Sequence, residues 1–154
     1  MKILLVDDEL EYGVVMKKIL QKKGYLVDIA LSGEEAINII KKDKNYDLVL
    51  SDVMMKNMDG VQLLDRIKSI NRDIEVILVT GYGSIENAVD AMKRGALSYF
   101  IKSNPIENLL EEVEKVKASK ISVSVQKNNF EFTLESKNRD FNNIIKIAKK
   151  AACK

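Results

Sequence analysis

Strand-like and helix-like stretches alternate five times along this chain, and this alternation limits its possible folds more than any other feature. Strands that alternate with helices form a parallel sheet joined by helical crossovers. Residues 2–6 and 47–51 are apolar almost throughout, as central strands covered by helices on both faces should be. We therefore predict an α/β fold with a doubly wound, five-stranded parallel sheet.

The helix boundaries are marked by residues that favour helix starts and stops. Ser32 and Asp59 each precede a Glu or Gln by three residues, which is the capping-box pattern of a helix start. Asn104 and Pro105 provide a cap and a first-turn proline for the last of these helices. Gly24 and Gly95 follow basic residues, as expected of glycines just beyond a helix end. These starts and stops agree with the alternating pattern.

Chemically reactive side chains follow the ends of four predicted strands. In chain order they are Asp7 and Asp8 after residues 2–6, Asp52 after residues 47–51, Thr80 after residues 75–79 and Lys102 after residues 97–101. Taken singly, each is ordinary, since an acid at a strand end is usually a helix cap or a turn residue. Ligands of a doubly wound sheet collect at the carboxyl ends of its strands, so we expect these groups to converge.

Three carboxylates at one point require a compensating charge. Two like charges ~4 Å apart repel by roughly 4 kcal/mol at an effective dielectric of ~20, so three acids need a metal ion or a protonated member. Oxygen ligands with open positions suit Mg²⁺, which is usually completed by water and a phosphate. The pattern predicts phosphoryl transfer to a carboxylate, with Asp52 attacking, Lys102 neutralising charge and Thr80 binding a phosphoryl oxygen.

The chain resembles the receiver domains of bacterial two-component response regulators over about residues 1–118. The motifs that carry the resemblance are ILLVDDE at 3–9, DLVLSD at 47–52, MDG at 58–60, TGYGS at 80–84 and YFIK at 99–102. The resemblance implies the strand order 2-1-3-4-5 and phosphorylation of Asp52 by a sensor histidine kinase. It also implies that Thr80 and Tyr99 form a switch pair, and that the chain is a regulator rather than an enzyme.

The resemblance further implies how Mg²⁺ would be bound. Asp8, Asp52 and the backbone carbonyl of Met54 would be ligands, and Asp7 would assist, through water. The chain contains no histidine, so a histidyl phosphate donor must be another protein. The face formed by residues 85–94, the fifth strand and residues 106–117 would change on phosphorylation. We expect a homodimer through that face or through the tail.

One motif departs from the family pattern. Receiver domains usually carry Lys-Pro with a cis bond after the fifth strand, whereas Lys102 is followed here by Ser103. A cis bond before a residue other than proline costs ~2.5–4 kcal/mol. We therefore expect a trans peptide and a rearranged loop, with the chemistry of Lys102 retained.

The pattern changes after residue 117. Apolar residues alternate with polar ones on both sides of residues 127–129, which is a hairpin pattern, although an isolated two-stranded ribbon is marginal in water. Ser136 or Asn138 then caps a helix with an apolar stripe. This tail is similar to the start of the ATPase domain in NtrC-like, sigma-54-dependent activators, but no Walker A motif follows. We predict a receiver domain at 1–118 and a linker with an amphipathic tail at 119–154, with DNA contact only through domains absent from this chain.

Other functions fit the sequence less well. A flavodoxin-like site needs backbone donors after the first strand, where Asp7 and Asp8 would repel a phosphate. An aspartyl-phosphate hydrolase of the haloacid dehalogenase type carries its nucleophile in a DxD pair, which is absent. An unphosphorylated pseudo-receiver, acting as an interaction module, is the remaining alternative. The single Cys153 and the absence of an apolar run of ~20 residues lead us to expect a soluble, cytoplasmic protein without a membrane segment.

Overall fold

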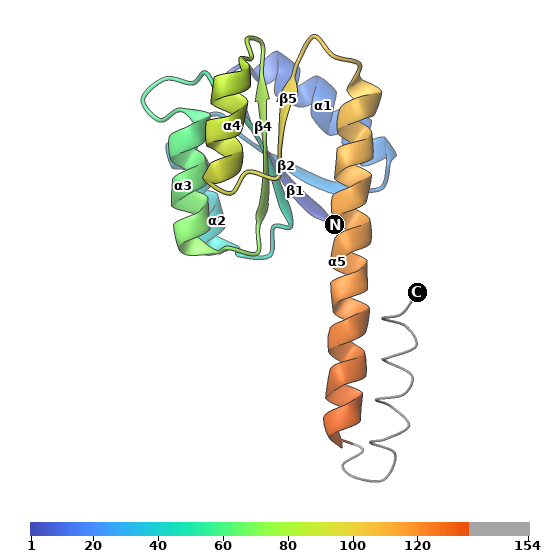
Figure 1. Ribbon diagram of the computed structural model, residues 1–154. Coiled ribbons are helices and arrows are strands. Elements are labelled where there is room, and N and C mark those ends of the chain that lie inside the picture. The colour runs from blue at the N-terminus through green and yellow to red at the C-terminus, as the bar shows by residue number, and fades with distance from the viewer. Residues whose placement is uncertain (136–154) are drawn as a thin grey trace. The chain divides into compact units, whose positions relative to one another are not determined.

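The computed structural model describes the backbone of residues 1–135 and the side chains of residues 1–122. The chain divides into two units, Met1–Val116 and Lys117–Lys154. The strands are β1 (Lys2–Val6), β2 (Leu26–Ala30), β3 (Leu48–Asp52), β4 (Glu75–Thr80) and β5 (Ser98–Ile101). The helices are α1 (Leu10–Lys22), α2 (Gly33–Lys42), α3 (Gly60–Ile70), α4 (Ile85–Lys93) and α5 (Ile106–Glu135), as Figure 1 shows.

The five strands form one parallel sheet in the order β2-β1-β3-β4-β5, so the predicted fold class and strand order are confirmed. Val6 of β1 is paired with Ser51 of β3, which brings the next residues, Asp7 and Asp52, level at the carboxyl edge. Thr80 is paired with Ile101 on the other side of β3. The register therefore sets the groups that follow each strand beside one another.

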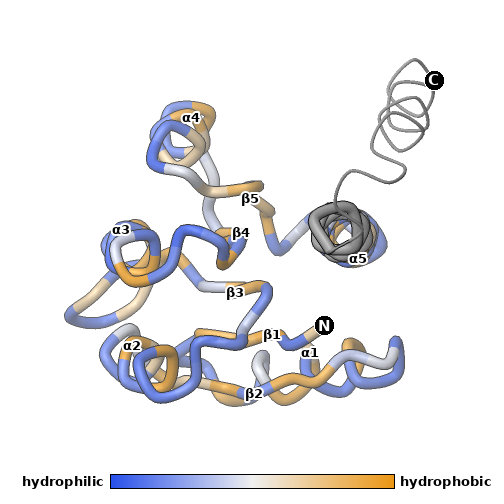
Figure 2. Tube along the Cα trace, turned by 90° about the horizontal axis from the view of Figure 1, so that it is seen from below, coloured by the Kyte–Doolittle hydropathy of each residue, from blue (hydrophilic) through white to orange (hydrophobic). Residues whose placement is uncertain are grey.

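Helices cover both faces of the sheet, and Figure 2 shows the strands between α2, α3 and α4 on one side and α1 and α5 on the other. Alternate side chains of β1 divide between the two cores, because successive residues of a strand point to opposite faces. Leu4 and Val6 belong to the core under α2 and α3, and Ile3 and Leu5 to the core under α1 and α5. Both faces of the central strands are buried, as their apolar sequence predicts.

The predicted helix boundaries within the first unit are largely confirmed. Asp59 and the Gln62 side chain exchange hydrogen bonds with each other's backbone N–H in a complete capping box. Ser32 accepts from the N–H of Glu35, but the Glu35 carboxylate accepts from Leu31 instead of closing the box. The glycines after α1 and α4 have φ angles of 91° and 103°, in the left-handed region where glycine is favoured.

The hairpin expected after residue 117 is wrong. Helix α5 runs from Ile106 to Glu135, and residues 121–134 are helical. No glycine or proline interrupts residues 106–135, so no local residue stops the helix. A helix also satisfies its backbone hydrogen bonds within itself, whereas a hairpin of this length would need a partner surface. The predicted cap at Ser136 or Asn138 and the apolar stripe beyond it lie outside the described residues.

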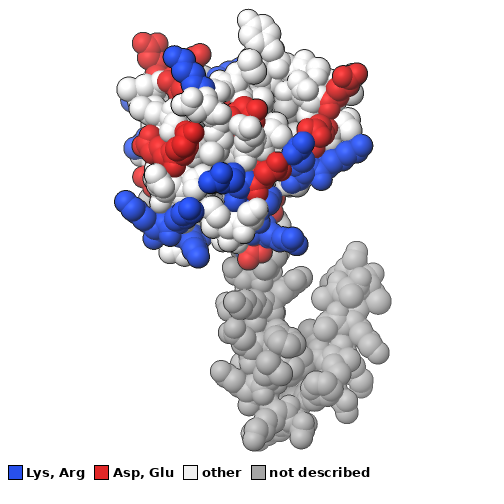
Figure 3. Space-filling model, turned by 90° about the vertical axis from the view of Figure 1, so that its left-hand side faces the viewer, with Lys and Arg blue, Asp and Glu red and all other residues white. Residues whose placement is uncertain are grey.

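On the surface that carries α2, α3 and α4, acidic and basic side chains are mixed and are separated by uncharged areas (Figure 3). Three aliphatic or thioether side chains of α4 are exposed there: Ile85, Val89 and Met92. Over the described part of the chain, none of the helices combines the length and apolar character that crossing a membrane requires.

Candidate functional site

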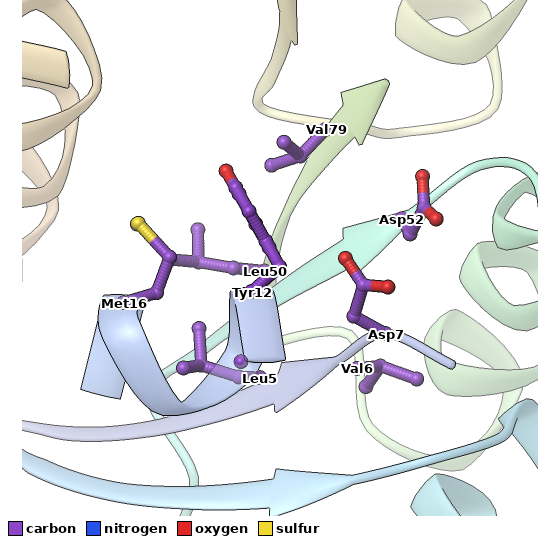
Figure 4. Close-up of a pocket in the computed structure, with 9 residues that line it drawn as sticks. Leu5, Val6, Asp7, Tyr12, Met16, Leu50, Asp52 and Val79 are labelled. Atoms are coloured by element: carbon purple, nitrogen blue, oxygen red, sulfur yellow. The ribbon is translucent and has the colours of Figure 1, made fainter. Parts of the chain in front are cut away.

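The carboxyl edge of the sheet brings three acidic side chains together. Asp7 and Asp8 follow β1, Asp52 ends β3, and one carboxylate oxygen from each lies within 4.8 Å of the others. Asp7 and Asp52 are buried, whereas Asp8 is exposed to solvent. Figure 4 shows Asp7 and Asp52 beside each other at the ends of neighbouring strands. The structure therefore brings together the acids that the sequence assigned to the site.

Lys102 supplies the positive charge that reaches this cluster. Its Nζ donates a hydrogen bond of 3.1 Å to Asp7 Oδ2 and lies 3.8 Å from Asp52 Oδ2. Burial lowers the pKa of Lys102, but the hydrogen bond to Asp7 and the charge of Asp52 outweigh it, so the pKa is raised and the amine stays charged. One ammonium cannot neutralise three carboxylates, which leaves excess negative charge at this edge.

The geometry after β5 agrees with the expectation drawn from Ser103. The described residues contain no cis peptide bond, so the Lys102–Ser103 peptide is trans. The backbone N–H of Lys102 donates a hydrogen bond of 2.7 Å to the Thr80 carbonyl, which continues the pairing of β5 with β4. This bond fixes the backbone from which the Lys102 side chain extends.

Asp52 has an unusual protonation equilibrium. Burial above all, and then the neighbouring Asp7 carboxylate, raise the pKa of Asp52 from its ordinary 3.8 to about 6. The charge of Lys102 and a backbone hydrogen bond from Met54 oppose this rise without cancelling it. A carboxylate that is costly to ionise in the isolated protein becomes easier to ionise beside a cation.

Gly60 explains the MDG motif in steric terms. A Cβ atom at Gly60 would lie 2.4 Å from the carbonyl oxygen of Asp52, closer than nonbonded atoms approach. The N–H of Gly60 also donates to the carbonyl of Val53. The start of α3 therefore packs directly on the backbone of the proposed acceptor, and sequence analysis gave no physical role for this glycine.

Thr80 and Tyr99, the predicted switch pair, lie on neighbouring strands. The Thr80 hydroxyl donates a hydrogen bond of 3.0 Å to the Tyr82 carbonyl and accepts one of 3.2 Å from the Tyr82 N–H. The hydroxyl is therefore held by the loop that follows β4. Among the described side chains, the Tyr99 hydroxyl is a buried oxygen without a hydrogen-bond partner. Buried polar atoms usually have a hydrogen-bond partner, so this position of the ring leaves the hydrogen-bonding capacity of the hydroxyl unused. A Cβ at Gly83 would lie 3.3 Å from Tyr99 Cε1, which shows how closely the loop after β4 approaches that ring.

Met54 and Tyr82 lie on the loops after β3 and β4, and their side chains are 68% and 87% exposed. Neither residue carries a carboxylate or amide that could orient a water molecule for attack on a group bound to Asp52.

Tyr12 is a residue of this site that sequence analysis missed. Lys102 Nζ lies 4.1 Å from the centroid of the Tyr12 ring, within the range of a cation–π contact. Burial raises the pKa of Tyr12, so its hydroxyl is neutral. The sequence signal is an aromatic residue in the first turn of the helix that follows the acid pair, but its neighbour Lys102 is 90 residues away along the chain.

The donor set fits a hard divalent cation. Carboxylate oxygens from two strand ends, one of them exposed, leave room for water and phosphate oxygens, as Mg²⁺ requires. His and Cys ligands typical of Zn²⁺ do not contribute to this cluster.

Comparison with known proteins places this geometry in a family. The profile of the response regulator receiver domain matches residues 3–114. The transcriptional regulatory protein ZraR of Escherichia coli K12 is 40% identical over 124 residues, covering 80% of this chain and 28% of that protein. Sporulation initiation phosphotransferase F of Bacillus subtilis is 35% identical over 114 residues, covering 74% of this chain and 91% of that protein.

A solved structure gives a similar result. The response regulator protein TrrA from Thermotoga maritima, in complex with Mg(2+)-BeF, matches with a TM-score of 0.68 and 34% identity, over 75% of this chain and 97% of that one. The chain spans just over a quarter of the length of the ZraR proteins that it matches.

Proposed function

This chain belongs to the response regulator receiver domain family, and on that premise we propose that it is a switch in which Asp52 accepts a phosphoryl group from a sensor histidine kinase. The observation that carries the proposal is the cluster of Asp7, Asp8 and Asp52, to which Lys102 alone among the described side chains forms an ion pair. The repulsion among these carboxylates destabilises the folded protein, and a bound cation reduces that repulsion. Receiver domains are signalling switches rather than classical enzymes, and the chemistry that we assign here consists of accepting and slowly losing one phosphoryl group.

Each residue of the cluster has a distinct role in this proposal. The Asp52 carboxylate forms a bond to phosphorus as the bond between phosphorus and the donor breaks, and the donor leaves with the electron pair. Asp8, Asp52 and the backbone carbonyl of Met54 would hold Mg²⁺, with Asp7 assisting, and bound Mg²⁺ neutralises charge on the phosphoryl oxygens. The complex of TrrA with Mg(2+)-BeF supports this assignment.

Lys102 and Thr80 would bind the phosphoryl oxygens once the group is in place. Lys102 already lies 3.8 Å from Asp52, so a small movement brings its ammonium to an oxygen on that residue. Thr80 would exchange its two contacts with Tyr82 for one with the phosphoryl group. This exchange draws the loop after β4 toward Asp52.

The movement of Thr80 would bias the position of Tyr99. Its buried, unpaired hydroxyl can gain a partner either from a rearranged loop or from solvent, so the ring has two alternative positions. The test is heteronuclear NMR with and without beryllofluoride on the parent, Thr80→Ala and Tyr99→Ala. We expect shifts across α4 and β5 in the parent and much smaller ones in Thr80→Ala. Full shifts in Thr80→Ala would contradict this route.

The output of the switch is proposed from the relatives. ZraR is named a transcriptional regulatory protein, and the TGYGS motif is similar to that of sigma-54-dependent activators, so we propose sigma-54-dependent transcription as the regulated process. Phosphorylation would change the face of α4, β5 and α5, where Ile85, Val89 and Met92 are exposed for contact with a second copy. Sedimentation with and without beryllofluoride tests the dimer, and an unchanged sedimentation coefficient would contradict it.

Phosphorylation itself is tested by incubation with acetyl phosphate and Mg²⁺, followed by intact mass measurement. We expect the parent to gain one phosphoryl group, and to gain none when Mg²⁺ is removed by EDTA. Asp52→Asn should gain none, whereas Asp43→Asn, which removes a carboxylate at the opposite edge of the sheet, should behave as the parent. Incorporation into Asp52→Asn, or none into the parent, would overturn the proposed function.

A further inference from the structure

The ammonium of Lys102 is held on three sides. Asp7 Oδ2 lies 3.1 Å away, Asp52 Oδ2 lies 3.8 Å away, and the face of the Tyr12 ring lies 4.1 Å away at its centroid. The negative face of an aromatic ring attracts a cation, and the attraction is strongest where both groups are shielded from water. The Lys102 side chain is only 20% exposed, so this condition is met.

The Tyr12 ring is fixed by its surroundings. Tyr12 lies in the first turn of α1 and packs against the core that α1 and α5 cover. It lines a small cavity together with Leu50, Val79 and Met16, and Figure 4 shows the ring rising from α1 between these side chains and the two acids. A ring held in this way offers a fixed surface to the lysine.

Lys102 needs such a surface because its side chain is flexible, although its backbone N–H is bound to the Thr80 carbonyl. A lysine side chain has a four-carbon stem with many rotamers and no planar group to restrict its head. The two carboxylates attract the ammonium but do not limit its approach from the side that Tyr12 closes.

We propose that Tyr12 is a positioning residue for Lys102, holding the ammonium between its ring and the two buried carboxylates, where it meets a phosphoryl group on Asp52. The inference rests on the proposed phosphorylation of Asp52 and adds a residue to it. Tyr12 acts through its aromatic face and not through its hydroxyl. Its effect is therefore on Lys102 and on the rate of phosphoryl transfer, and not on the binding of Mg²⁺ at the exposed side of the cluster.

The test compares Tyr12→Phe, which keeps the ring, with Tyr12→Leu, which keeps an apolar side chain without a ring. With acetyl phosphate and Mg²⁺, we expect Tyr12→Leu to be phosphorylated about three- to ten-fold more slowly than the parent and Tyr12→Phe at nearly the parent rate. Met16→Leu alters another wall of the same cavity, which Lys102 does not line, and it should leave the rate unchanged. Tyr12→Leu and Met16→Leu at equal rates would overturn the inference.

A second measurement reports on position directly. The ε-methylene protons of Lys102 should be shifted upfield by the ring in NMR spectra of the parent and Tyr12→Phe, and this shift should vanish in Tyr12→Leu. A parent without the upfield shift would overturn the inference even if Tyr12→Leu fails to fold. If the upfield shift is present but acetyl phosphate does not modify the parent, the proposed function fails while the contact of Tyr12 with Lys102 stands.

Discussion

Both edges of the sheet gather carboxylates around one lysine, but two of these carboxylates are buried at the carboxyl edge and none is buried at the other. At the amino edge, Asp43 accepts a hydrogen bond from the Lys2 ammonium, and Asp47 accepts one of 2.8 Å from the Lys2 backbone N–H. A third acid, Asp28 in the middle of β2, accepts a hydrogen bond of 2.6 Å from the Tyr46 hydroxyl, and the Lys2 ammonium lies over the Tyr46 ring. Each of these acids therefore has a donor close by.

At the carboxyl edge the same number of acids also shares one ammonium, but here Asp7 and Asp52 are buried. The consequence is visible in opposite changes of pKa. The hydrogen bond from Lys2 lowers the pKa of Asp43, whereas burial and the charge of Asp7 raise the pKa of Asp52 to about 6. Both clusters have three carboxylates and one lysine over a tyrosine ring, so they differ in burial and not in charge balance or residue type.

The contrast separates a structural cluster from a functional one. A cluster in contact with water holds β1, β2 and the segment before β3 together, and water already screens its charges. A cluster with buried carboxylates stores an unfavourable interaction that a bound cation can relieve. Removing single members of the two clusters should therefore have unequal effects.

The largest effect should follow loss of the lysine at the carboxyl edge. Lys102→Ala should stay folded but lose the NMR response to beryllofluoride with Mg²⁺, because no other ammonium reaches Asp52 among the described ion pairs. Lys2→Ala removes the matching lysine at the amino edge and should keep the full response. Equal responses of Lys102→Ala and the parent would show that the ammonium is not needed.

A smaller effect is expected from the two acids that follow β1. Asp8 is exposed and is the expected direct ligand, so Asp8→Asn should weaken Mg²⁺ binding about ten-fold, while Asp7→Asn should weaken it less. Asp28→Asn, in the middle of β2, should leave Mg²⁺ binding unchanged. Titration with Mg²⁺, followed by NMR, measures all three, and a larger loss in Asp7→Asn would reverse the assignment.

The smallest effect concerns the lifetime of the phosphorylated state. Met54 and Tyr82 are exposed on the loops beside the acid cluster and cannot orient an attacking water. Replacing Met54 by Asn and Tyr82 by Glu together should shorten the lifetime several-fold, as followed by loss of the phosphoryl mass. A lifetime equal to or longer than that of the parent would contradict this explanation.

Much of the fold could be predicted because local and tertiary signals agree. Asp59 and Gln62 cap α3 where the sequence indicates, and apolar strands lie at the centre of the sheet where a buried strand is required. The strand ends then fixed where the acids meet, because parallel strands deliver their carboxyl ends to one edge.

The sequence was less informative where two secondary structures compete for one segment, and where a contact joins residues far apart along the chain. Residues 121–134 alternate like strands, but a continuous helix without glycine or proline prevails. The contact of Tyr12 with Lys102 joins α1 to the end of β5, and no local pattern reports a pairing between such distant residues. The clash that a side chain at Gly60 would cause likewise depends on the folded path of β3.

The most direct test of the contrast between the edges is the free energy of unfolding of metal-free Asp52→Asn and Asp43→Asn. The folded protein binds a proton at Asp52 more tightly than the unfolded chain does, so Asp52 is destabilising above about pH 6, and this penalty is relieved as the pH falls toward 4. The contribution of Asp43 to stability has the opposite sign. Its pKa is lowered in the folded protein, so its ionised form stabilises the fold at pH values above the ordinary pKa of an aspartate.

At pH 7.5 in EDTA, Asp52→Asn should therefore be more stable than the parent by roughly 1–3 kcal/mol, and the gain should shrink at pH 5. Asp43→Asn should be less stable than the parent at pH 7.5. Added Mg²⁺ should stabilise the parent and Asp43→Asn but not Asp52→Asn. If both variants lose stability in EDTA and Mg²⁺ stabilises all three proteins equally, the ionised Asp52 carries no penalty from burial and the account is wrong.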